Sequence, residues 1–144
     1  MSAASTRPLR LLLVEDSEPC RALFACLIED VRGCVGAGIE CDCACSGAEA
    51  LDRLRDRHYD ALVLDQNMPG MSGLEVLAAL RHIRWDAAHP KVLAYSSCDA
   101  PDFRRRCLAA GADAFASKYM CAPEFISVLQ QLGLVAGDAA GSHA

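Results

Sequence analysis

Short apolar runs alternate with amphipathic stretches along most of the chain. Runs of strand length occur at 9–14, 39–45, 61–64, 92–95 and 114–116. Between them, apolar residues recur at spacings of three and four, which is typical of helices that pack through one face. Strands that alternate with helices in this way predict an α/β domain with a parallel sheet and helices on both faces.

Helix-start signals lie between the apolar runs. The first helix is predicted to follow Pro19, and S-x-x-E patterns at 46–49 and 72–75 predict capping boxes for the next two. A short fourth helix is expected from about 100 to 110, and a fifth after Pro123. Right-handed crossovers then give a doubly wound α/β domain. The flavodoxin-like strand order, 2-1-3-4-5, fits five strands.

The length of 144 residues corresponds to one domain. We expect that domain to occupy residues 9–132. Residues 1–8 are expected to form a flexible N-terminal tail. The Gly- and Ala-rich segment 133–144 is expected to form a flexible C-terminal tail.

Charge and hydropathy exclude several function classes. The net charge of −5 repels a phosphate backbone, so we expect no nucleic-acid binding by this chain. No apolar run approaches the roughly 18 residues of a membrane span, and the run at 11–14 is too short for a signal peptide. These features favour a cytoplasmic protein with no membrane partner.

The chain contains nine cysteines, an odd number. In a cytoplasmic protein we expect mostly buried, free thiols. Cys41, Cys43 and Cys45 would form a row on one face of a strand. Packing in the core is the preferred interpretation of this row, because zinc sites usually place two to four residues between paired cysteines. A thiol redox or metal module stays open as a weaker alternative.

Polar side chains stand where the predicted strands end. Glu15 and Asp16 follow the first strand, Asp65 the third, Ser96 the fourth and Lys118 the fifth. The carboxyl ends of parallel strands share one edge of the sheet, so these groups should meet there. Clustered carboxylates repel one another unless a hard cation such as Mg²⁺ binds them. With a lysine beside them, they suit phosphoryl transfer to a carboxylate.

Four segments carry a resemblance to a known family. LLLVED, ALVLDQNMPGMSGLEVL, KVLAYSS and GADAFASKYM, in this order, resemble the successive signatures of response-regulator receiver domains. The resemblance runs from about residue 9 to 132 and is to the single-domain type, similar to the chemotaxis response regulator. It implies a phosphoprotein of a two-component signal-transduction system, which assists its own phosphorylation and dephosphorylation but is not a conventional enzyme.

The resemblance also implies roles for individual residues. Asp65 would be the phosphoacceptor, and Lys118 would contact the phosphoryl group. Glu15, Asp16 and Asp65 would hold Mg²⁺, together with the backbone carbonyl of Asn67. The donor would be a phosphohistidine on a sensor histidine kinase or a histidine phosphotransfer protein of a phosphorelay.

Further family positions concern switching and phosphoryl lifetime. Ser96 would move toward the phosphoryl group, and Phe115 would be the coupled aromatic switch residue. Cys98 and Asn67 would flank the path of the hydrolytic water, so we expect Cys98 to affect the lifetime of the phosphorylated state. The Arg104–Arg106 run is either a solvated helix face or a contact for a downstream protein.

Two features depart from the family pattern. Tyr119 follows the lysine where the family usually has proline. A cis bond before a non-proline residue costs about 2.5–4 kcal/mol, so we expect a trans bond there. The second departure is that no output domain follows the receiver, so output is expected through a protein target that the sequence does not identify. The alternative is a receiver-like adaptor that is not phosphorylated.

Overall fold

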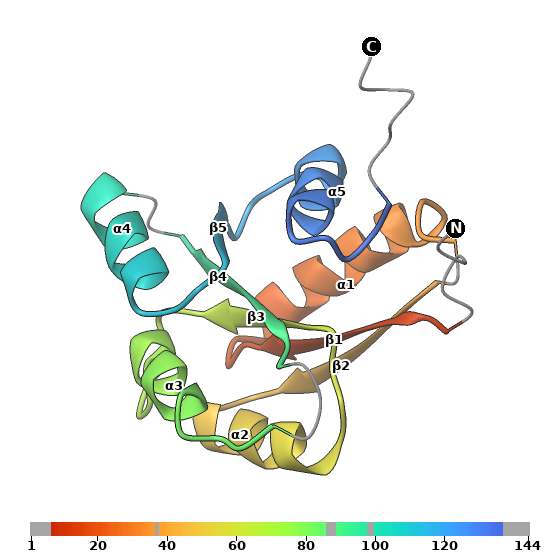
Figure 1. Cartoon of the computed structure of the whole chain (residues 1–144). Helices are drawn as coiled ribbons and strands as arrows, with labels where there is room; N and C mark the ends of the chain where they lie inside the picture. Colours follow the sequence, from red (N-terminus) through yellow and green to blue (C-terminus); the bar gives the residue numbers. More distant parts are fainter. Residues whose placement is uncertain (1–6, 37, 86–88, 98–99, 137–144) are drawn as a thin grey trace.

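The structure is a computed structural model that describes residues 7–36, 38–85, 89–97 and 100–136 (Figure 1). Five parallel strands form one sheet in the order β2-β1-β3-β4-β5, as predicted. The strands are β1 (Leu9–Val14), β2 (Ile39–Ala44), β3 (Ala61–Asp65), β4 (Lys91–Ser96) and β5 (Ala114–Ser117). The predicted ranges differ from these by one residue at some strand ends, where periodicity carries the least information.

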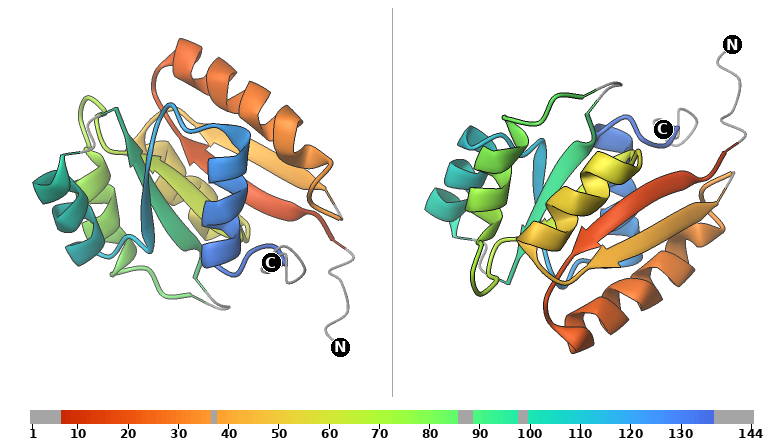
Figure 2. Two further views of the ribbon diagram at one scale, coloured as in Figure 1. Left: turned by 90° about the horizontal axis from the view of Figure 1, so that it is seen from above. Right: turned by 90° about the horizontal axis from the view of Figure 1, so that it is seen from below.

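Five helices connect the strands. They are α1 (Glu18–Arg32), α2 (Gly47–Asp56), α3 (Gly73–Leu80), α4 (Pro101–Ala109) and α5 (Ala122–Gln131). Helices α1 and α5 cover one face of the sheet, and α2, α3 and α4 cover the other (Figure 2). The doubly wound, flavodoxin-like architecture predicted from the sequence is therefore the observed one.

The helix starts follow the predicted signals with two corrections. Helix α1 begins at Glu18, with Pro19 inside its first turn, so it does not start after the proline. At the start of α2 the Glu49 carboxylate accepts the N–H of Cys45, one residue before the cap, so only half of the predicted box forms. The box of α3 is complete, because Ser72 and Glu75 each accept the backbone N–H of the other.

The central strands are buried on both faces. Leu11 and Leu13 of β1 pack toward α1 and α5, and Leu12 and Val14 pack toward α2, α3 and α4. This explains the almost continuous apolar runs in the sequence, because a parallel sheet between two helix layers leaves neither face to water. The polar residues that end these strands are thus held on a rigid scaffold.

The cysteine row does not pack as predicted. Cys41 is half-buried, whereas Cys43 and Cys45 are exposed. Of the cysteines in the described residues, Cys107 alone is fully buried, so the expectation of mostly buried thiols is wrong for this part of the chain. The row is exposed because β2 is an edge strand, with a neighbouring strand on one side only. Burial, with Cys43 and Asp42 nearby, raises the pKa of Cys41 to about 12.

The chain continues to pack after α5. Gly133 has φ +74°, and the N–H of Leu134 bonds the carbonyl of Leu129 at 2.9 Å, as in a glycine-capped helix end. Leu134 and Val135 pack against the core beside α1 and α5.

Among the described helices, none is long and apolar enough to cross a membrane.

Candidate functional site

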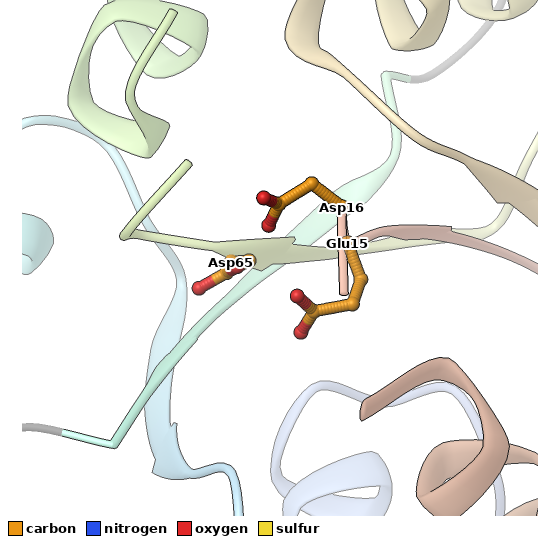
Figure 3. A group of neighbouring side chains, drawn as sticks. All are labelled: Glu15, Asp16 and Asp65. Atoms are coloured by element: carbon orange, nitrogen blue, oxygen red, sulfur yellow. The ribbon is translucent and has the colours of Figure 1, made fainter. Parts of the chain in front are cut away.

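Three carboxylates converge at the carboxyl edge of the sheet (Figure 3). Glu15 and Asp16 directly follow β1, and Asp65 is the last residue of β3. One carboxylate oxygen from each lies within 4.8 Å of the others. Glu15 and Asp65 are fully buried, while Asp16 is exposed. The strand ends therefore bring together the acids that the sequence singled out.

Lys118 joins two of these acids. Its Nζ lies 3.0 Å from Oε1 of Glu15 and 3.1 Å from Oδ1 of Asp65. Burial acts to lower the pKa of Lys118, but the bonds to both carboxylates outweigh it, so the pKa is raised. The buried part of the site thus holds two carboxylates and one ammonium group, which leaves it with an excess of negative charge when both acids are ionised.

The two oxygens of Asp65 differ in their surroundings. Oδ1 accepts the backbone N–H of Asn67 at 3.0 Å in addition to the Lys118 bond. Oδ2 is buried and has no hydrogen-bond partner among the described residues. Burial raises the pKa of Asp65 to about 6, with the carboxylate of Glu15 adding to the effect. Burial acts to raise the pKa of Glu15, but its hydrogen bonds together outweigh burial, so the pKa is lowered. The bond from Tyr95 contributes most among them. Oδ2 of Asp65 is therefore able to bind a cation or to form a new covalent bond.

The donor set fits Mg²⁺. It consists of carboxylate oxygens from Glu15, Asp16 and Asp65, and hard oxygen ligands with open positions for water suit this ion. Asn67 follows two residues after Asp65 and is held beside it by its own N–H. In the described part of the chain, no comparable set of cysteines or histidines comes together, so the cysteine row does not form a metal site there.

Ser96 and Phe115 occupy neighbouring strands. Ser96 ends β4, is buried, and its Oγ accepts a bond from Nδ2 of Asn67 at 3.2 Å. Phe115 of β5 faces α4, where its ring meets Phe103 edge to face at 6.1 Å. The guanidinium of Arg104 lies 5.8 Å from the same ring. The serine therefore borders the carboxylates, and the aromatic ring borders α4. Cys98 lies outside the described residues.

Tyr119 also meets its expectation. None of the peptide bonds in the described ranges is cis, so the Lys118–Tyr119 bond is trans. The Tyr119 N–H donates to Oγ of Ser117 at 3.1 Å, and the side chain is 69% exposed. It lines a pocket of about 210 Å³ between α1 and the segment after β5, which Lys118 and Cys20 also line.

Sequence reasoning missed one residue of the site. The hydroxyl of Tyr95, on β4, donates to Oε1 of Glu15 at 2.7 Å, and both side chains are buried. In the sequence Tyr95 belongs to the apolar run at 92–95, which predicts only a strand. The available signal was its hydroxyl, since a buried tyrosine usually finds a hydrogen-bond partner for its O–H.

Comparisons with known proteins agree with this geometry. The sequence model of the family described as response regulator receiver domain matches residues 11–130. The polar-differentiation response regulator DivK of Brucella ovis is 32% identical over 120 residues, which are 83% of this chain and 92% of DivK. The sensory/regulatory protein RpfC of Xanthomonas campestris is 31% identical over 132 residues, 91% of this chain, and the chain spans 17% of RpfC.

Solved structures show the same fold. A CheY-like response regulator receiver domain from Methylobacillus flagellatus superposes with a TM-score of 0.73 at 26% identity. The match covers 87% of this chain and 98% of that one. Receiver domains of this family are signalling modules and are generally not classed as enzymes. The chain belongs to the response-regulator receiver domain family.

Proposed function

We propose that the chain accepts a phosphoryl group on Asp65 with the help of Mg²⁺, and that the phosphorylated form binds a downstream protein. The observation that carries this proposal is the state of the Asp65 carboxylate. Lys118 and the Asn67 N–H hold Oδ1, while nothing within the described ranges bonds the buried Oδ2. One oxygen is fixed, and the other is available as a nucleophile beside two further acids.

The donor is a phosphohistidine of a sensor histidine kinase or a histidine phosphotransfer protein. Ionised Asp65 attacks phosphorus through Oδ2, the P–N bond breaks, and the leaving histidine nitrogen takes up a proton. A bound Mg²⁺ supplies neutralisation of the charge that develops on the phosphoryl oxygens. Glu15, Asp16 and Asp65 would hold that ion, and the backbone carbonyl of Asn67 would be a further ligand.

The surrounding residues give phosphorylation a route to α4. Lys118 turns from Asp65 to a phosphoryl oxygen, and Ser96 exchanges its bond with Asn67 for one to the phosphoryl group. These bonds favour one state of a pre-existing equilibrium. Phe115 pairs with β4 at Ala94 and packs on Phe103 of α4, so a movement at the end of β4 reaches that helix.

The output surface is formed by α4 and its neighbours. Arg104, Arg105 and Arg106 are exposed on α4. Arg104 and Arg106 lie over the rings of Phe115 and Phe103, so part of this basic face rests on the switch residue. We assign this face to a protein target with complementary acidic groups in the cytoplasm. The net charge of −5 argues against nucleic acid as the target.

Intact-mass measurement with a small-molecule phosphodonor tests the proposal. Wild type is expected to gain one phosphoryl adduct in the presence of Mg²⁺ and none in EDTA, and Asp65→Asn is expected to gain none. Asp60→Asn is the matched control, because Asp60 lies just before β3, at the opposite end of the strand, and bonds Arg10 and Arg7 there. An adduct on Asp65→Asn, or none on wild type, would contradict the proposal and favour the unphosphorylated adaptor.

A further inference from the structure

Tyr95 lies next to the phosphoacceptor in the sheet. It pairs in register with Asp65 across β3 and β4, and it is 2% exposed. Its ring packs edge to face against Phe24 of α1, with centroids 6.1 Å apart. The Lys118 ammonium lies 5.5 Å from the centre of the same ring. The position of the phenol is therefore set by the sheet and by α1, and it leaves the hydroxyl little freedom to move.

The Tyr95 hydroxyl and Lys118 together occupy one oxygen of Glu15. Oε1 accepts both the Tyr95 O–H at 2.7 Å and the Lys118 Nζ at 3.0 Å. The donor that the described residues provide for Oε2 is the backbone N–H of Ser17, at 3.1 Å. A carboxylate oxygen accepts about two hydrogen bonds. Oε1 is thus fully used, and Oε2 keeps one acceptor position for the shell of a cation.

The two donors on Oε1 differ in permanence. Lys118 has a flexible side chain, and in the proposed function it turns to a phosphoryl oxygen. Tyr95 is held by its ring packing, and within the described ranges its hydroxyl donates to Glu15. Hydrogen bonds to an ionised group are the strong ones, and long side chains such as glutamate otherwise sample several rotamers. The Tyr95 hydroxyl is the side-chain donor that holds Glu15 throughout the reaction.

We propose that Tyr95 is a positioning residue for the cation site. Its hydroxyl keeps the Glu15 carboxylate beside Asp16 and Asp65, with Oε2 as the oxygen that faces the cation shell, while Lys118 exchanges partners. The inference rests on the proposed function, because it concerns the same Mg²⁺ site. It assigns to Tyr95 the outer-shell role of the groups that orient metal-binding carboxylates.

The test is the affinity of the unphosphorylated protein for Mg²⁺, measured by isothermal titration calorimetry. Tyr95→Phe removes one oxygen atom and leaves the ring. We expect its Kd for Mg²⁺ to rise about tenfold. Tyr59→Phe is the matched control: Tyr59 is also 2% exposed, and its hydroxyl donates to a carboxylate, Oδ2 of Asp42, at 2.6 Å. Asp42 lies on β2, outside the carboxylate group, so the control is expected to bind Mg²⁺ as wild type does.

A double-mutant cycle separates positioning from a general structural effect. In a Glu15→Ala background the Tyr95 hydroxyl has no carboxylate to hold, so adding Tyr95→Phe is expected to leave the Kd for Mg²⁺ unchanged. An equal rise in both backgrounds would show that Tyr95 acts by another route and would overturn the inference. An unchanged or lowered Kd in the single variant would overturn it as well.

The outcomes also distinguish this inference from the proposed function. If wild type binds Mg²⁺ and takes up a phosphoryl group on Asp65, but Tyr95→Phe binds Mg²⁺ equally well, only the role of Tyr95 fails. If wild type neither binds Mg²⁺ nor accepts a phosphoryl group, both fail together.

Discussion

Lys118 bonds one carboxylate oxygen of Asp65 and does not bond the other. Its Nζ lies 3.1 Å from Oδ1, whereas Oδ2 is buried and meets no donor from the part of the chain that the structure describes. In the absence of a cation this buried carboxylate is costly to ionise, which raises its pKa. The relationship makes the site ready for a ligand at Oδ2 and gives several measurable consequences.

The first prediction concerns stability against pH in metal-free protein. The pKa of Asp65 is raised from 3.8 to about 6, so between these values the folded state binds more protons than the unfolded state. The free energy of unfolding therefore falls as pH rises through this window. Asn at position 65 does not ionise. We therefore expect the free energy of unfolding of Asp65→Asn to exceed that of wild type by about 3 kcal/mol at pH 7. Urea unfolding in EDTA at several pH values measures the difference.

The same experiment has a clear contrary outcome. The advantage of Asp65→Asn should shrink below pH 6 and disappear below 3.8, where Asp65 of wild type becomes protonated in both states. Glu15, whose pKa is lowered, is present in both proteins and contributes stability that is lost as pH falls. An Asn variant less stable than wild type at pH 7 would contradict the proposed electrostatics.

The second prediction concerns stabilisation by Mg²⁺. A ligand that binds only the folded state adds about 2.7 kcal/mol at a concentration about 100 times its Kd. We expect this gain in wild type and its loss in Asp16→Ala, because the variant lacks one of the three carboxylates of the site. Asp16 is the exposed member of this group. Thermal unfolding with Mg²⁺ and with EDTA provides the measurement. Glu18→Ala removes an equal charge two residues away and should keep the Mg²⁺ response; a loss there would point to nonspecific charge effects.

The third prediction concerns the close approach of α3 to the phosphoacceptor strand. A Cβ at Gly73 would lie 2.5 Å from Nε2 of Gln66 and 2.7 Å from the backbone oxygen of Asp65. Gly73→Ala must therefore shift the start of α3, the Gln66 side chain or the Asp65 backbone, and overpacking of this kind costs about 1–3 kcal/mol. We expect lower stability by urea unfolding and slower phosphorylation. Gly33, whose φ is −68° and whose Cβ would meet nothing within 4 Å, is the control: Gly33→Ala should be neutral or slightly stabilising.

The fourth prediction concerns thiol reactivity. Cys107 is fully buried, and burial raises the pKa values of Cys107 and Cys41. A thiol-alkylating reagent at neutral pH should therefore spare these two and label the exposed Cys26, Cys34, Cys45 and Cys121 first. Peptide mass analysis after brief alkylation reports the pattern, with unfolded protein as the reference. Early labelling of Cys107 would show that α4 opens readily.

The fifth prediction concerns Cys98, which lies outside the described residues and is judged by its place two residues after Ser96. Oxidation of a cysteine beside the phosphoryl group would add polarity and bulk. Dephosphorylation rates of wild type and Cys98→Ala, each reduced and oxidised, are expected to differ. Equal rates in all four samples would remove Cys98 from the account of phosphoryl lifetime.

Much of the fold could be predicted because the local periodicity of apolar residues indicates which elements form and which of their faces are buried. A strand buried on both faces needs a continuous apolar run, and a helix on the sheet needs a stripe at a spacing of three and four. Right-handed crossovers make the units doubly wound, and the carboxyl ends of the parallel strands then collect Glu15, Asp65 and Lys118 at one edge. The order 2-1-3-4-5 was the flavodoxin-like arrangement that fits five such units. Exact helix starts were less certain, as Glu18 and the half-formed box at Ser46 show, because side chains choose between neighbouring backbone donors.

The sequence by itself determined the α/β class and the acids that end the strands, and five strand–helix units fitted the flavodoxin-like strand order. Only the tertiary structure decided that Tyr95 bonds Glu15, 80 residues away, and that Oδ2 of Asp65 is left without a donor in the described residues. It also decided that Cys43 lies exposed on an edge strand. Periodicity reports which face of an element is buried, but the partner of a polar atom depends on register and packing between elements that are distant in the chain.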